Sequence, residues 1–194
     1  MKFIVSYSQE RDMYNYLNTI WKDQYRKYGE NDTSSLFGIC PKTIQNIIRE
    51  TKTKEEAKKI INAFLTGKHK NFKYSTKQRA IVIQKYLNGE REEIISTVEK
   101  VYGKKFPFEE IQVYITTLGI YPYNYTKRWY MVPRNASPKI YFRIATHELN
   151  HLMFYKYYYD DLKEKITPHQ VAVLKEALAI LTNNEGGRKP EVKP

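Results

Sequence analysis

The chain has 194 residues, with 33 lysines and arginines against 21 aspartates and glutamates, so its formal net charge is +12. A hydrophobic content of 41% suffices for one sizeable core and excludes a wholly disordered chain. The single cysteine, Cys40, excludes a disulfide framework and favours a reducing cytoplasm, and no run of about 20 apolar residues predicts a membrane span.

The first hundred residues predict helices that begin at capping residues. A serine or threonine followed three residues later by glutamate or glutamine is typical of a capping box, and glycine or asparagine often ends a helix. Helices are expected from Ser6-x-x-Gln9 to before Gly29, over 41–50, from Thr53-x-x-Glu56 to Gly67, from Ser75-x-x-Gln78 to Asn88-Gly89, and over 90–102.

The pattern then changes to that of strands. Apolar and polar residues alternate over 111–116, a second strand candidate covers 128–132, and 121–124 has the composition of a turn. These elements predict an α+β fold, mostly helical, with a small sheet. We expect one compact domain over 1–184, made of a helical part (1–103) and a second part (104–184), followed by a flexible tail over 185–194.

The second part contains a His-Glu-x-x-His motif, His147-Glu148-Leu149-Asn150-His151. Ser137-Pro138 predicts the start of a helix through this motif, and apolar residues recur along it at helical spacing. Residues four apart stack on one face of a helix, so both imidazoles can reach one metal ion while Glu148 lies over the same site. The alternative is a pair of hydrogen-bonded core histidines.

A catalytic zinc ion needs a third protein ligand. Asp160 and Asp161 are the nearest downstream carboxylates. The helix is expected to continue past His151, which would carry Asp160 roughly 13 Å along its axis, too far to share the metal. We therefore interpret both aspartates as residues of a solvated helix end.

Glu176 fits the third position better. Thr167-Pro168-His169-Gln170 predicts a capping box and a helix from Pro168 to about Asn183. Glu176 lies near Ala172 and Ala179, small residues that let another helix approach closely. The alternative is an exposed glutamate paired with Lys175 or Lys163. The apolar stripe of this helix is expected to comprise Val171, Leu174, Leu178 and Leu181.

Glu176-Ala177-Leu178-Ala179 begins 25 residues after His151. Together with the His-Glu-x-x-His motif, this segment resembles the gluzincin branch of the zincin metallopeptidases. The metzincin branch is excluded, because Phe154 and Tyr157 stand where it has glycine and histidine. The residues around the motif are also similar to those of ImmA/IrrE-type peptidases. The gluzincin resemblance implies a zincin-like catalytic part with His147, His151 and Glu176 as Zn2+ ligands. It also implies Glu148 as general base and an edge strand that pairs with an extended peptide or protein substrate.

The leading hypothesis is thus a zinc-dependent peptidase in which Glu148 accepts a proton from a zinc-bound water. A second donor must stabilise the developing oxyanion, and Tyr155, Tyr158 and His169 are the candidates. The alternative is a basic nucleic-acid-binding or regulatory protein with a structural or inactive site, since 18 tyrosines interleaved with basic residues could stack bases. The lysines are scattered, which favours solvated helix faces. The sequence does not predict an oligomeric state.

Overall fold

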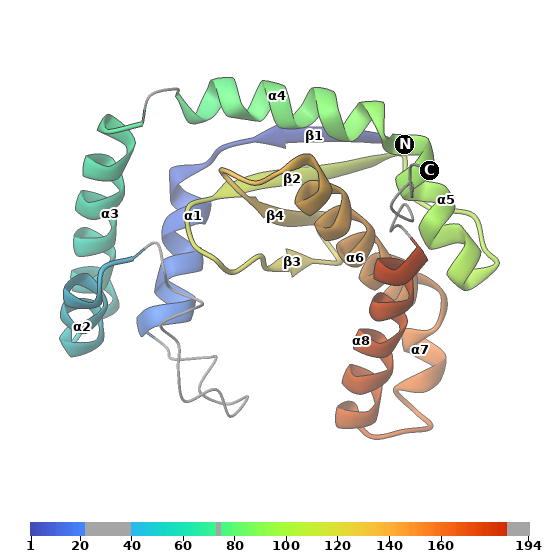
Figure 1. The fold of residues 1–194 in the computed structure, drawn as a ribbon. Helices are drawn as coiled ribbons and strands as arrows, with labels where there is room; N and C mark the ends of the chain where they lie inside the picture. Colours follow the sequence, from blue (N-terminus) through green and yellow to red (C-terminus); the bar gives the residue numbers. More distant parts are fainter. Residues whose placement is uncertain (22–39, 73–74, 186–194) are drawn as a thin grey trace, which may run out of the picture.

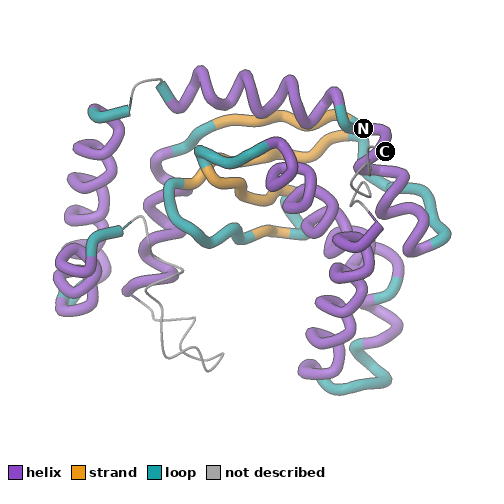
Figure 2. Tube along the Cα trace, in the orientation of Figure 1, coloured by secondary structure: helices purple, strands orange, loops and turns teal. Residues whose placement is uncertain are grey.

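The computed structural model describes residues 1–21, 40–72 and 75–185 and has an α+β fold, as the sequence predicts (Figure 1). Helices surround one four-stranded sheet (Figure 2). The strands are β1 (Lys2–Ser6), β2 (Glu110–Thr116), β3 (Tyr123–Asn124) and β4 (Trp129–Pro133). The helices are α1 (Gln9–Tyr16) with the π-helical turn η1 (Leu17–Trp21), α2 (Lys42–Glu50), α3 (Lys54–Lys70), α4 (Thr76–Gly89), α5 (Arg91–Tyr102), α6 (Pro138–Tyr157), α7 (Tyr159–Leu162) and α8 (Pro168–Glu185).

The sheet has the strand order β1-β2-β4-β3. Strand β2 pairs in parallel with both β1 and β4, whereas β3 pairs antiparallel with β4. Because side chains alternate along a strand, the register that aligns Val5, Val113 and Tyr130 puts one set of core residues on a single face: Phe3, Val5, Ile111, Val113, Ile115, Tyr130 and Val132. Helices α4 and α6 pack on that face, and their apolar residues share its core. Helix α1 covers part of the other face.

Side chains of α4 cover the outer edge of β1. The backbone amide of Phe3 donates to Asn88 Oδ1, and the side-chain amide of Asn88 donates back to the Phe3 carbonyl. The Val5 amide donates to Gln84 Oε1. An exposed strand edge is a template for pairing with another chain, so α4 blocks this edge. The opposite edge of the sheet is β3, which lies beside α6 (Figure 1).

The N-terminal elements correct one prediction. Ser6 does not cap a helix: it is the last residue of β1, and the side chain of Ser8 caps α1 by accepting from the Arg11 amide. The alternation of buried Phe3 and Val5 with more exposed neighbours matches a strand. Pairing with β2, about a hundred residues away, stabilises that strand and moves the helix start two residues later. The expected end near Gly29 lies outside the described residues.

The capping predictions for the next helices are confirmed. Thr53 with Glu56 and Ser75 with Gln78 both form reciprocal capping boxes. Helix α3 nevertheless continues through Gly67 to Lys70, since an isolated glycine weakens a helix without having to end it. Gly103 ends α5 in the left-handed conformation, with φ of 60°.

The strands before the motif are confirmed, but their arrangement is not a simple hairpin. Strands β2 and β4 are parallel, and the connection between them contains β3 at residues 123–124, inside the expected turn. The prediction of one continuous helix from His151 to Asp160 is also wrong. Helix α6 ends at Tyr157, and Tyr158, with φ of −133°, separates it from α7.

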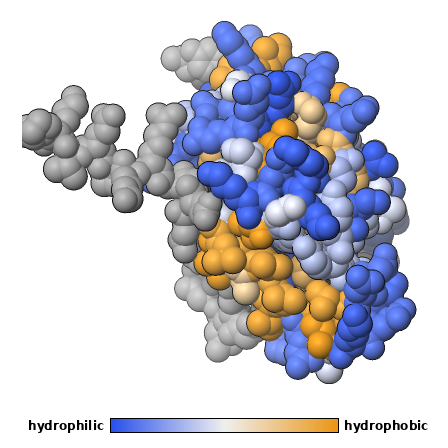
Figure 3. All heavy atoms as spheres, turned by 90° about the vertical axis from the view of Figure 1, so that its right-hand side faces the viewer, coloured by the Kyte–Doolittle hydropathy of each residue, from blue (hydrophilic) through white to orange (hydrophobic). Residues whose placement is uncertain are grey.

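Helix α8 begins as predicted and extends to Glu185, but its buried face differs from the expected stripe. Val171, Ala179 and Thr182 are buried, whereas Leu174 and Leu181 are exposed. With Val173 and Ile180 they form an outward apolar face, and Figure 3 shows hydrophobic residues gathered on the side of the molecule that carries α8. Helix α8 therefore has two apolar faces, one buried and one exposed. The sequence pattern predicts a single apolar stripe.

The two expected parts of the domain share one sheet, because β1 belongs to residues 1–103 and its partner β2 to 104–184. The expected tail lies outside the described residues apart from Glu185. Within the described ranges, no helix has the length and apolarity needed to cross a bilayer.

Candidate metal centre

The His-Glu-x-x-His motif lies in the middle of α6, as predicted. Ser137 precedes the helix and Pro138 is in its first turn. Because His147 and His151 are one turn apart, their rings lie together, with centroids separated by 4.5 Å. His151 is buried, with 2% of its side chain exposed, whereas His147 is 30% exposed. The pair is thus open to solvent on the His147 side.

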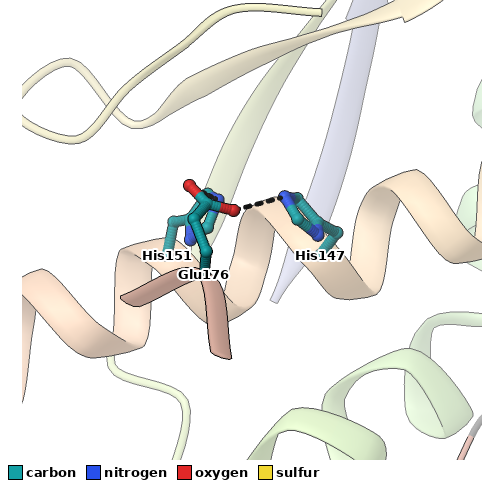
Figure 4. Close-up of side chains that lie close together, drawn as sticks. All are labelled: His147, His151 and Glu176. Carbon is teal, nitrogen blue, oxygen red and sulfur yellow. Dashed lines mark ion pairs between the residues drawn. The ribbon is translucent and has the colours of Figure 1, made fainter. Parts of the chain in front are cut away.

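Helix α8 brings Glu176 to both imidazoles. Glu176 Oε2 lies 3.7 Å from His147 Nε2, and Oε1 lies 3.6 Å from His151 Nε2 (Figure 4). One ligand atom from each residue can be chosen so that all three lie within 4.8 Å of one another. Glu176 is 25 residues beyond His151 in the sequence, so only the packing of α8 on α6 produces this cluster.

The three side chains carry the donor atoms of a tetrahedral metal site and lie near, but not at, its spacing. Zinc binds imidazole nitrogen and carboxylate oxygen at about 2.0–2.2 Å, and two ligands of a tetrahedral ion are then roughly 3.3–3.4 Å apart. The two separations of 3.6 and 3.7 Å are close to this value, but they end on different oxygens of Glu176, and one donor atom from each residue gives separations of up to 4.8 Å. The three residues therefore match the donor set of a catalytic zinc site, which leaves a fourth position for water.

Both histidines favour the neutral form that binds metals. Burial lowers the pKa of His151 to about 2, and the positive charge of Lys175 acts in the same direction. Burial also lowers the pKa of His147, although the nearby Glu176 carboxylate acts in the opposite direction. A neutral imidazole offers a lone pair to a cation, so neither histidine needs to lose a proton at neutral pH before it binds one.

Asn150, inside the motif, fixes α8 against α6. It is fully buried, and its side-chain amide donates to the backbone carbonyl of Leu178 at 2.9 Å. The hydroxyl of Tyr102, on α5, donates to Asn150 Oδ1 at 2.7 Å. Leu178 is two residues from Glu176, so this network determines where α8 places its carboxylate. Ala179 is also buried, which permits the close approach expected from its small side chain. Ala172, named with it, is exposed.

Two residues of the site did not emerge from the sequence. Lys175, only 12% exposed, donates from its ammonium to Glu176 Oε1 at 2.7 Å and to the hydroxyl of Tyr123 at 2.9 Å. The ring of Tyr123, on β3, packs against that of His151 with centroids 4.9 Å apart. Lys175 was considered only as a partner of an exposed Glu176. That ion pair is present, and the Glu176 side chain is 53% exposed. Since Glu176 also faces both histidines, Lys175 can hold one carboxylate oxygen and orient the other.

Glu148 lies beside the cluster in an environment suited to proton transfer. It is 6% exposed, and its Oε2 atom has no hydrogen-bond partner within the described part of the chain. Burial raises the pKa of Glu148 to about 8, against an opposing effect of Lys175. A carboxyl group whose pKa is close to neutrality can both accept and return a proton.

The other sequence-predicted residues lie outside the metal cluster. Asp160 pairs with Lys163 at 2.6 Å, in agreement with a solvated helix end. Among the oxyanion candidates, Tyr158 packs against Tyr102, His169 is exposed in the first turn of α8, and Tyr155 lies behind Tyr123, with ring centroids 6.3 Å apart. Tyr123 has a direct ring contact with His151, with planes inclined by 34°. Short-range spacing along α6 could not identify a residue of the sheet edge.

Comparisons with protein-family models, curated proteins and solved structures found no match to this chain.

Proposed function

We propose that the protein is a zinc-dependent peptidase of the zincin type, with His147, His151 and Glu176 as metal ligands. One observation carries the proposal: two helices that are separate in the sequence bring these ligand atoms within 4.8 Å of one another, beside a buried carboxyl group. Bound to such a set, Zn2+ would lower the pKa of its water towards neutrality and polarise a substrate carbonyl.

The surrounding side chains have distinct roles in this proposal. Glu148 accepts a proton from the attacking water and delivers it to the leaving amine. Lys175 orients Glu176 through their ion pair. The Tyr123 hydroxyl accepts a hydrogen bond from Lys175 and is also hydrogen-bonded to Tyr155, so a substrate oxygen would take its proton in place of Tyr155. Burial raises the pKa of Tyr123 well above its usual range, which keeps the hydroxyl protonated at neutral pH. Strand β3 offers the sheet edge along which an extended peptide can pair.

Metal content and hydrolysis of a peptide library test the proposal together. The wild-type protein, stripped and then repleted, is expected to hold about one equivalent of zinc and to cleave peptides. His151→Ala and Glu176→Ala should both weaken zinc binding. His169→Ala is the matched control for the histidine, since His169 is exposed on α8 outside the cluster. Glu148→Gln should retain zinc but lose hydrolysis, whereas Glu164→Gln, a change of an exposed glutamate, should alter neither.

Three outcomes would contradict the proposal. Less than about a tenth of an equivalent of zinc after repletion would remove the metal site. Full hydrolysis by Glu148→Gln would remove Glu148 as the base. Salt-sensitive binding of oligonucleotides by the metal-free protein, without any peptide cleavage, would favour the nucleic-acid-binding alternative.

A further inference from the structure

A tyrosine-lined cavity adjoins the metal cluster. Its volume is about 490 Å³, within the range of ligand-binding pockets. The lining comes from β3 and the turn after it, from the C-terminal part of α6 and from α7: Tyr123, Asn124, Tyr125, Thr126, Tyr155, Tyr159 and Asp160. Because Tyr123 also packs on His151, the cavity and the cluster share a wall. A peptide held at the metal would therefore have a neighbouring side chain close to this cavity.

The walls are aromatic and electron-rich. Tyr125 and Tyr155 are stacked, with centroids 5.1 Å apart and planes inclined by 22°, and Tyr159 lies 4.9 Å from Tyr155. The faces of aromatic rings carry partial negative charge and attract cations. Asp160 is the single charged residue among those lining the cavity, as far as the described chain extends. The chain as a whole has a formal charge of +12, but the lining of this cavity is electron-rich and carries one carboxylate. The cavity is therefore complementary to a positive group.

Two cations of the chain itself already lie against this wall, one of them the Lys175 ammonium, 5.0 Å from the centroid of the Tyr123 ring. The Lys163 ammonium lies 2.6 Å from Asp160 Oδ1 and 5.8 Å from the centroid of the Tyr159 ring. Both partners are well exposed, with 45% of the Lys163 side chain and 80% of the Asp160 side chain accessible. Exposed pairs of this kind contribute little to stability, so another cation can replace Lys163 at small cost.

We propose that the tyrosine-lined cavity binds the lysine or arginine side chain of a peptide next to the bond that is cleaved. The inference rests on the proposed peptidase function and adds its substrate class. Aromatic faces hold the aliphatic stem and the positive charge, and Asp160 at the exposed rim pairs with the ammonium or guanidinium group. The cavity should bind a positively charged side chain more tightly than a neutral side chain of the same length, because the neutral one gains only the apolar contact.

Matched peptides measure this preference directly. Quenched fluorescent peptides carry lysine, arginine or norleucine beside the cleavage site, first on one side and then on the other. For the repleted wild-type enzyme, kcat/KM for the lysine or arginine peptide should exceed that for the norleucine peptide by about fivefold to tenfold. Asp160→Asn should reduce this ratio several-fold. Lys163→Ala removes the internal competitor and should increase it.

Asp161→Asn is the control, since Asp161 is exposed next to Asp160 but does not line the cavity. Equal kcat/KM for the lysine and norleucine peptides on both sides of the cleaved bond would overturn the inference while leaving the peptidase function intact. An unchanged ratio in both Asp160→Asn and Lys163→Ala would also overturn it.

If the wild-type protein cleaves none of the peptides, the proposed function fails and the cavity is tested by binding. Calorimetric titration of the same lysine and norleucine peptides into the wild-type protein should still give tighter binding of the lysine peptide, with the difference reduced by Asp160→Asn. Equal binding of both peptides would overturn the inference independently of catalysis.

Discussion

The side-chain amide of Asn150 donates to the backbone carbonyl of Leu178, and this bond joins the helix of the two histidines to the helix of Glu176. Asn150 also accepts a hydrogen bond from Tyr102, so three helices meet at one buried side chain. The position of Glu176, the third proposed metal ligand, therefore depends on a side chain that is not itself one of the proposed ligands.

Replacing this residue should weaken metal binding without removing a ligand. Asn150→Ala removes the side-chain bonds to the Tyr102 hydroxyl and the Leu178 carbonyl, although the hydroxyl keeps its bond to the backbone carbonyl of residue 150. Loss of the two side-chain bonds should cost about 1–3 kcal/mol of unfolding free energy. We expect zinc affinity to fall about 10–100-fold, as for other residues that support metal ligands. Competition with a chelator measures the affinity, and thermal melting measures the stability. Asn46→Ala, at an exposed position on α2, should change neither; an equal loss of affinity in both variants would contradict this role.

The small size of Ala179 should also be required for the site. Ala179→Leu overfills the buried contact between α6 and α8 and should destabilise the fold by about 1–3 kcal/mol. Because α8 must then move outward, zinc affinity should fall as well. Ala172→Leu makes the same change at an exposed position of α8 and should be nearly neutral. Denaturant unfolding and chelator competition compare the two variants, and equal effects would show that the packing at Ala179 is not limiting.

The buried carboxyl group of Glu148 should make the stability of the metal-free protein depend on pH. Its pKa is about 8 in the fold, against an ordinary value of 4.5, so the fold favours the protonated carboxyl group. Its contribution to stability is then fully present below about pH 4.5 and is lost as the pH rises through 8. Over that window the wild-type protein should lose stability relative to Glu148→Gln, by up to about 1.4 kcal/mol per pH unit.

Denaturant unfolding at several pH values, with chelator present, measures this difference between the two proteins. Zinc should reduce it, since a nearby cation favours the ionised carboxylate. Parallel pH profiles in the absence of zinc would show that Glu148 titrates near its ordinary pKa.

The hydroxyl of Tyr123 should matter for hydrolysis more than for metal binding. Tyr123→Phe keeps the ring that packs on His151 but removes the group bonded to Lys175. We expect kcat to fall about a hundredfold, in the range seen when an oxyanion donor is removed, while zinc affinity stays within about a factor of two. Steady-state kinetics and chelator competition test this expectation. A Phe variant with wild-type kcat would assign the tyrosine a packing role only.

The sequence by itself determined the features that depend on neighbours a few residues away. The spacing of His147 and His151 places both on one helix face, whatever that helix packs against. The capping boxes at Thr53, Ser75 and Thr167 fix helix starts because each involves residues only three apart. The alternation at 111–116 predicted a strand for the same reason.

Tertiary structure decided the features that join distant segments. Sequence pattern selected Glu176 as a candidate, but its approach to both histidines depends on Asn150 and Ala179 at the contact between two helices. Strand β1 needed its pairing with β2 to be recognised, and α8 has two apolar sides of which only one is buried. Tyr123 reaches His151 from the edge of the sheet. Periodicity is local, whereas these contacts depend on how complete elements pack. The pattern therefore names the proposed metal ligands, and the packing brings them together.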